Sequence, residues 1–148
     1  MIYLEDLKIG EDVELGSVPV TREEVIAFAT RYDPQPFHLS DEAAAQTHFG
    51  RLAASGWHTA AMAMGVIARH VLDTKQAGLG SPGVDELRWL RPVYPGDTLT
   101  VRSRVLKITP SRSKPHMGSF RTAVTVSNQD GAPVMTFTSI VLMRRRPV

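Results

Sequence analysis

The sequence places a carboxylate and an imidazole five residues apart in the segment Asp33-Pro34-Gln35-Pro36-Phe37-His38. Its two prolines stiffen the backbone, so less conformational entropy is lost when both side chains are fixed toward one pocket. An aspartate and a histidine that hold one water can remove a proton from it and donate a proton elsewhere, which is general acid–base chemistry. Asp33 and His38 are therefore the candidate catalytic pair, although so short a pattern is also typical of a turn aspartate and an ordinary surface histidine.

Ser55-Gly56 is a second candidate, because it precedes a long stretch with helical spacing of apolar residues. The first N–H groups of a helix lack intrahelical partners and lie at the positive end of the helix dipole. Such groups can bind an anion or a polarised carbonyl oxygen, and Gly56 would let a ligand approach the backbone closely. The alternative is that Ser55 serves only as a helix cap.

Three helices are expected to position these residues. Thr21 followed by Glu24 is a capping-box pattern, and it predicts a helix that ends near Tyr32 because prolines follow. Residues 33–40 are expected to form a stiff extended loop, after which Ser40 or Asp41 caps a short second helix. The third helix begins at residues 55–56. It is apolar on all sides until Arg69, which predicts that it is buried all round.

The second half of the chain alternates between apolar and polar residues, as strands do. Together with an early strand near residues 12–20, the strands are expected at about 84–93, 98–108, 119–127 and 134–143. A sheet with an apolar face must pack on another element. The pattern therefore predicts a single α+β domain over residues 1–148, in which a curved antiparallel sheet of about five strands wraps around the long central helix.

Composition excludes several classes of protein. With 148 residues, 43% hydrophobic and 22% charged residues, the chain has ordinary globular values and the length of one domain. It contains no cysteine, which excludes a disulfide scaffold, a cysteine-ligated zinc site and a thiol nucleophile. His48, His58 and His70 have no clear metal-ligand spacing, and no glycine-rich phosphate loop is present. No signal peptide or membrane-length apolar run is visible, so we expect a cytoplasmic protein without a metal, a membrane or a nucleic-acid partner.

Charge is distributed unevenly along the chain. Residues 1–74 carry 5 Lys and Arg against 11 Asp and Glu, whereas residues 75–148 carry 12 against 4. The basic half could bind a phosphorylated ligand, with Lys107, Arg112 and Lys114 as the first candidates. The alternative is that the two halves pair with each other within the fold.

The order of several short motifs resembles the MaoC-like dehydratases, a group that includes the (R)-specific enoyl-CoA hydratases. The resemblance covers nearly the whole chain. Its residues are Asp33-Pro34-Gln35-Pro36-Phe37-His38, Phe49-Gly50, Ala54-Ser55-Gly56 and Pro92-Val93-Tyr94-Pro95-Gly96-Asp97. The chain departs from the family pattern at Gln35, where the motif usually has Asn.

This resemblance implies a hotdog fold and a hydratase or dehydratase that acts on an acyl-CoA or an acyl-carrier thioester in fatty acid metabolism. Asp33 and His38 would act on water, and the Gly56 N–H, next to Ser55, would polarise the thioester carbonyl. Gln35 and Trp57 are further candidates for substrate binding. The resemblance also implies a homodimer with an acyl tunnel between its subunits, and no cofactor apart from the coenzyme A or pantetheine of the substrate.

Two other functions on the same fold remain open, because fold alone does not choose among them. One is a thioesterase, which would also use a carboxylate and a helix N-terminus. The other is a protein without catalytic activity that binds acyl-CoA or serves as a partner subunit.

Overall fold

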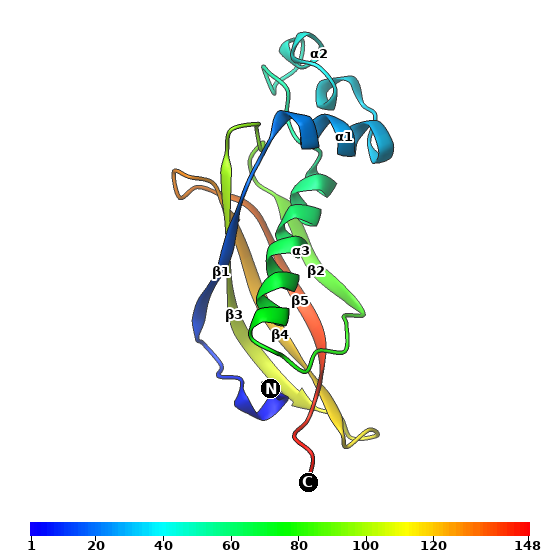
Figure 1. The fold of residues 1–148 in the computed structure, drawn as a ribbon, viewed down its shortest axis with the longest axis vertical. Coiled ribbons are helices and arrows are strands. Elements are labelled where there is room, and N and C mark those ends of the chain that lie inside the picture. Colours follow the sequence, from blue (N-terminus) through cyan, green and yellow to red (C-terminus); the bar gives the residue numbers. More distant parts are fainter.

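The five expected strands form one antiparallel sheet in the computed structural model, which describes all 148 residues (Figure 1). The strands are β1 (Asp12–Pro19), β2 (Gly83–Trp89), β3 (Thr98–Pro110), β4 (Met117–Ser127) and β5 (Pro133–Arg144). Their order across the sheet is β1-β3-β4-β5-β2, so β1 and β2 are the edges. Burial alternates residue by residue along β4, because successive side chains of a strand point to opposite faces of the sheet.

The long helix α3 (Gly56–Asp73) lies along the concave face of this sheet (Figure 1). Its buried residues, which include Met62, Ala63 and Val66, join one hydrophobic core with Leu99 and Val101 of the sheet. The sheet curves closely around the helix at Gly16, where β1 has an irregular register and φ is +144°. A Cβ at this position would lie 3.2 Å from the Val66 side chain, so glycine permits both the backbone conformation and the close packing.

Only one face of α3 is covered within the single chain, which differs from the expectation of burial all round. Trp57, Met64 and Leu72 are 59%, 49% and 75% exposed. With Ala61 and Ala68 they form an apolar stripe at helical spacing. We call these five residues the α3 stripe. The helix is thus apolar on both faces, but only one of them packs on the sheet, and the other is largely exposed.

The segment before α3 folds over the N-terminal end of that helix (Figure 1). It contains α1 (Arg22–Tyr32), the short 3-10 helix η2 (Pro36–His38) and the short helix α2 (Asp41–Ala45). The caps are those that the sequence indicates: Thr21 accepts a hydrogen bond from the Glu24 N–H, and Ser40 accepts one from the Ala43 N–H. The expected extended loop at 33–40 is wrong in part, because proline is well suited to the first position of a helical turn and Pro36 starts η2.

Other segments at the edges of the fold differ modestly from the expectations. A 3-10 turn, η1 (Leu4–Asp6), precedes β1. β2 ends at Trp89 instead of continuing to residue 93. The Leu90 N–H still donates to the Val134 carbonyl of β5 at 2.8 Å. After it the chain leaves the sheet, and the Val93 carbonyl accepts a hydrogen bond from the Ala54 N–H at 2.8 Å. None of the helices is long and apolar enough to cross a membrane.

The acidic half of the chain (residues 1–74) and the basic half (residues 75–148) form several ion pairs with each other. Arg102 contacts Asp12 and Glu14 across β3 and β1, and Arg145 and Arg146 contact Glu5 and Asp6. All of these pairs join the basic half to the acidic half. They lie at the surface, where such pairs contribute at most about 1 kcal/mol each.

The side chain of His58 joins α1 to α3. It is buried and stacks on Phe28, with ring centroids 4.8 Å apart and an interplanar angle of 12°. Its Nδ1 has no hydrogen-bond partner. Burial lowers the pKa of His58, and the negative charge of Glu24 opposes this only in part. The neutral imidazole is therefore the form that the packed helices favour.

We expect the His58→Phe variant to lose less folding stability than the wild type as the pH falls from 7.5 to 5. The pKa of His58 is lower in the folded chain than its usual value of about 6.5, so the unfolded chain binds the proton more readily. The stability that neutral His58 contributes is complete above about pH 6.5 and is lost as the pH falls toward the folded-state pKa. Phenylalanine keeps the stack and does not titrate. Urea unfolding at pH 5 to 7.5 should show the advantage of the variant growing as the pH falls. Parallel curves for the two proteins would contradict this role.

Candidate active site

Asp33 stands at the C-terminal end of α1, where the helix stops. Its backbone N–H still donates to the Ala29 carbonyl at 2.9 Å, but its own φ and ψ of −153° and 67° are not helical. Pro34 accounts for this, because a proline disfavours the helical conformation in the residue before it. The end of the helix thus fixes the backbone from which the carboxylate projects.

His38 is placed by η2 and held by one hydrogen bond. Its side chain is 6% exposed, and its Nδ1 lies 2.7 Å from the carbonyl oxygen of Ala53. A carbonyl oxygen only accepts, so Nδ1 carries the hydrogen. In the neutral imidazole, Nε2 then has the free lone pair. This Nε2 faces Asp33 Oδ2 at 3.5 Å, which is longer than a direct hydrogen bond.

Two further side chains hold the Asp33 carboxylate. Ser55 Oγ donates to Oδ2 at 2.7 Å, and Gln35 Nε2 donates to Oδ1 at 2.7 Å. Burial raises the pKa of Asp33, but these two hydrogen bonds and the nearby His38 outweigh it, so the net pKa lies below the usual value. Asp33 is therefore ionised at neutral pH. Gln35, the residue that departs from the expected motif, binds the carboxylate directly.

Ser55 does not cap α3 with its side chain, because its hydroxyl is engaged by Asp33. The reading of Ser55-Gly56 as a simple cap is therefore wrong. The N–H groups of Gly56 and Trp57, at the start of α3, make no hydrogen bond within the chain. They remain free to donate to a ligand atom at the positive end of the helix dipole.

Close packing with Trp89 requires glycine at position 56. A Cβ on Gly56 would lie 2.5 Å from the Trp89 ring, and the indole Nε1 donates to the Gly56 carbonyl at 2.8 Å. Trp89 thereby ties the end of β2 to the first turn of α3. Trp57 meets the edge of the same ring system, with centroids 5.0 Å apart.

A pocket of about 410 Å³ opens beside this cluster. Its lining includes His38, Gly56 and Thr59, together with Trp89 and Arg91. Asp33 is not part of the wall, and its side chain is 17% exposed. The remaining lining residues are His48, Phe49, Ala54, Leu90, Pro92 and Val93.

The structure brings together some of the residues expected from the sequence and separates others. Asp33, Gln35, His38, Ser55 and Gly56 form one cluster. Trp57 lies mainly on the open face of α3 and does not line the pocket.

The three basic candidates for phosphate binding do not reach this cluster within one chain. Lys107 is on β3, and Arg112 and Lys114 are in the β3–β4 hairpin, at the end of the molecule opposite α1 and α2 (Figure 1).

Thr59, Trp89 and Arg91 line the pocket and were not expected from the sequence. A usable signal existed only for Thr59, which is three residues after Gly56 and hence on the same face of the helix. Trp89 and Arg91 reach the pocket through the pairing of β2 with β5, which no local pattern indicates.

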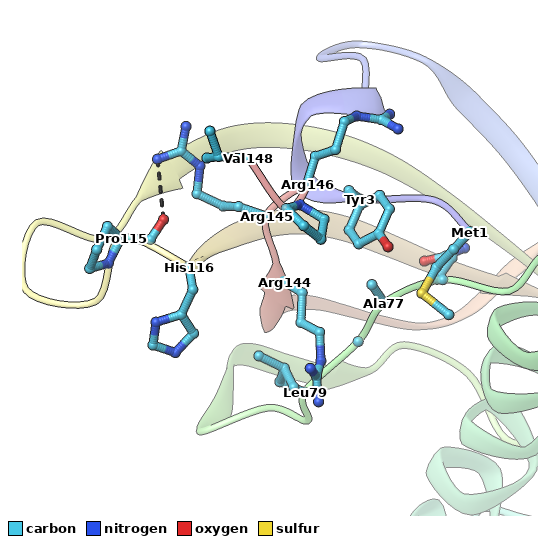
Figure 2. Close-up of a pocket in the computed structure, with 13 residues that line it drawn as sticks. Met1, Tyr3, Ala77, Leu79, Pro115, His116, Arg144, Arg145, Arg146 and Val148 are labelled. Carbon is cyan, nitrogen blue, oxygen red and sulfur yellow. Dashed lines mark hydrogen bonds between the residues drawn. The ribbon is translucent and has the colours of Figure 1, made fainter.

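A second pocket, of about 800 Å³, lies at the far end of the sheet (Figure 2). Its wall includes Arg144, Arg145, Arg146 and His116. Arg145 and Arg146 are paired with acidic residues of η1, and neither Asp33 nor His38 lines it. It is therefore distinct from the candidate active site.

We expect Ser55→Ala to raise the pKa of Asp33. The variant removes one of the two hydrogen bonds that oppose the effect of burial on this carboxyl. Titration of the side-chain carboxyl followed by ¹³C NMR measures the shift. Ser17→Ala is the matched control, because the Ser17 hydroxyl bonds to Thr100 on the sheet and should leave the titration unchanged. An unaltered Asp33 curve in Ser55→Ala would show that the hydroxyl does not hold the carboxylate.

Comparison with known proteins identifies the family of this chain. A family model described as MaoC like domain matches residues 6–128. The crystal structure of a MaoC-like dehydratase from Rhodospirillum rubrum has a TM-score of 0.89 and 40% identity, with 100% of each chain covered. The (R)-hydratase from A. caviae involved in PHA biosynthesis has a TM-score of 0.71 and 26% identity, over 97% of this chain and 99% of that one.

Similarity to a curated protein agrees with this assignment. A 3-hydroxybutyryl-CoA dehydratase of Methylorubrum extorquens is 34% identical over 116 residues, which are 77% of this chain and 70% of that protein. With its five-stranded antiparallel sheet around one long helix, the chain belongs to the MaoC-like domain family and has the hotdog fold.

Proposed function

We propose that this chain hydrates a 2-enoyl thioester of coenzyme A or a carrier protein to the 3-hydroxyacyl thioester, or catalyses the reverse dehydration. The observation that carries the proposal is the 3.5 Å gap between Asp33 Oδ2 and His38 Nε2. With His38 in the neutral form, both atoms are hydrogen-bond acceptors, so one water that lies beside them can donate a hydrogen bond to each. Hydratases and dehydratases among the relatives support the same reaction class.

The two acceptors prepare the water for attack. A water that donates both hydrogens to Asp33 and His38 keeps its lone pairs free for C3 of the enoyl group. As the C3–O bond forms, Nε2 of His38 takes the proton, and the electron pair of the C2–C3 double bond moves toward the thioester. The ionised Asp33 stabilises the imidazolium that results. The imidazolium then returns the proton to C2, so that one water has been added and both residues are restored.

Negative charge develops on the thioester oxygen while the enolate-like transition state forms. Donors aimed at that oxygen contribute strongly to the rate, because they stabilise the transition state more than the ground state. The free N–H groups of Gly56 and Trp57 are suited to this role. The mechanism requires only the side chains and backbone groups of this site.

One assay separates hydration from the two alternative functions on this fold. Crotonyl-CoA is incubated with the protein, and the loss of the conjugated double bond and the release of free thiol are both followed. Loss of the double bond alone supports hydration, thiol release alone supports a thioesterase, and neither signal supports a binding or structural role.

We expect Asp33→Asn and His38→Ala each to lower kcat by about 10²–10⁴, the usual contribution of a general acid–base group. Asparagine keeps the shape of Asp33 and removes its charge. The double variant should be scarcely slower than the slower single variant, because residues that act on one water are not additive. Steady-state kinetics with crotonyl-CoA measure all three proteins.

His116→Ala is the matched control for the histidine variant, since this exposed side chain lies in the far pocket. His48 and His58 are unsuitable, because one lines the catalytic pocket and the other is buried against Phe28. Near-normal rates in folded Asp33→Asn and His38→Ala would refute the pair. Effects that multiply in the double variant would place the two residues in separate steps.

We further propose that the protein is a homodimer formed through the α3 stripe. In this stripe, Trp57, Met64 and Leu72 are largely exposed. The neighbouring edge strand β2 carries Val84, which is 45% exposed. Contiguous apolar surface of this kind marks an interaction site, and an unpaired strand edge is a template for pairing. A two-fold axis would allow the same patch on two copies to cover each other.

Sedimentation should show a species of twice 16.3 kDa at micromolar concentration. Met64→Glu places a charge at the centre of the stripe and should shift the equilibrium toward the monomer. Arg104→Glu, a charge change at an exposed position of β3, serves as the control and should leave the dimer intact. A wild-type protein that sediments only as a monomer would exclude the dimer.

A further inference from the structure

Thr59 presents an unpaired hydroxyl to the catalytic pocket. The residue is 1% exposed and lines the pocket together with His38 and Gly56. Its backbone N–H donates to the Ser55 carbonyl at 3.1 Å, but its hydroxyl makes no hydrogen bond within the chain. The buried polar side-chain atoms that are sealed from solvent without a partner are His58 Nδ1 and Thr122 Oγ1. Thr59 Oγ1 is not among them, so the small exposure of Thr59 includes its hydroxyl.

A helical threonine ordinarily satisfies its hydroxyl on the carbonyl four residues earlier. For Thr59 that carbonyl belongs to Ser55, and it already accepts the N–H groups of His58 at 2.9 Å and of Thr59 at 3.1 Å. The hydroxyl therefore remains without this partner. A nearly buried hydroxyl without a partner destabilises the folded chain. Valine, which has the same shape, would avoid this loss.

The direction of the side chain points to what the hydroxyl serves. Side chains of a helix tilt toward its N-terminus, so Thr59 leans over the turn that contains Gly56. Residues three apart also share one face of the helix. The hydroxyl of Thr59 and the free N–H group of Gly56 therefore border the same pocket, which His38 also lines.

We infer that the Thr59 hydroxyl donates a hydrogen bond to the carbonyl oxygen of the bound acyl thioester, as a catalytic residue beside the N–H of Gly56. The inference rests on the proposed function, because it assumes that an acyl thioester occupies this pocket. The hydroxyl strengthens its hydrogen bond as negative charge builds on the oxygen. The unpaired hydroxyl of Thr59 lowers the stability of the folded chain, but it remains available to donate to the ligand.

Thr59→Val tests the inference because it removes the hydroxyl and keeps the volume. We expect kcat for crotonyl-CoA to fall by about 10²-fold, the effect of losing one such donor, while the melting temperature stays the same or rises. Thr59→Ser should retain most of the activity. A purely structural role would instead lower the melting temperature and leave kcat in the folded protein unchanged.

Thr122→Val is the matched control. Thr122 is 7% exposed and its Oγ1 also lacks a partner, but it lies in β4 and does not line the pocket. It should show the same neutral or favourable change in melting temperature with unchanged kinetics. Equal kinetics in Thr59→Val and Thr122→Val would overturn the inference.

A binding measurement separates this inference from the proposed reaction. Butyryl-CoA has the thioester oxygen but no double bond to hydrate, and its affinity is measured by calorimetry. If the wild type binds it and hydrates no enoyl-CoA, the proposed reaction fails, and weaker binding by Thr59→Val, by about threefold to tenfold, still supports the contact. Equal affinities of the two proteins for butyryl-CoA, or no binding by the wild type, would contradict it.

Discussion

The hydrogen bond from Ser55 to Asp33 is the interaction on which the site depends. It joins the end of α1 to the start of α3, across 22 residues of sequence. The bond takes the Ser55 hydroxyl away from the helix N-terminus, where it would otherwise satisfy an N–H group. It also helps to keep the pKa of Asp33 below its usual value despite burial. One hydroxyl therefore has two consequences: an ionised carboxylate beside His38, and helix N–H groups left free for a ligand.

Packing between the sheet and α3 fixes where that helix begins. The Trp89 ring rests on Gly56 so closely that no side chain fits between them, and its indole N–H is bonded to the Gly56 carbonyl. Further along α3, Met62, Ala63 and Val66 belong to the hydrophobic core that holds the helix against the sheet. The position of the free N–H groups is thus set by β2 as well as by the helix itself. Residues with no reactive group determine the geometry of the site.

Local chemistry explains which features could be predicted from the sequence. Prolines after α1 and the caps at Thr21 and Ser40 act within a few residues, so the helix boundaries near Asp33 were predictable. The pairing of Asp33 with His38 was predictable for the same reason. Contacts that require the folded sheet were not, which is why Trp89 was missed. For the same reason no local pattern indicated that Lys107 is absent from the lining of the pocket beside Asp33. The open face of α3 was missed because apolar composition does not distinguish packing within a chain from packing between chains.

Unpaired polar groups on α3 show where the molecule departs from the most stable arrangement. His58 and Thr59 are adjacent and nearly buried. The Nδ1 of His58 is sealed from solvent without a partner, whereas the side chain of Thr59 lines the pocket. Both lie in the first turns of the helix, one against α1 and the other against the pocket. Buried polar groups are nearly always paired, so the Nδ1 of His58 is an exception, whereas the hydroxyl of Thr59 can be satisfied by a ligand in the pocket. Thr122 is an exception of the same kind within the sheet, and nothing around it in the structure explains it. An unpaired polar atom therefore indicates a function only where a ligand or a proton can become its partner. Of the two threonines, only Thr59 lines a pocket in which a ligand could bind.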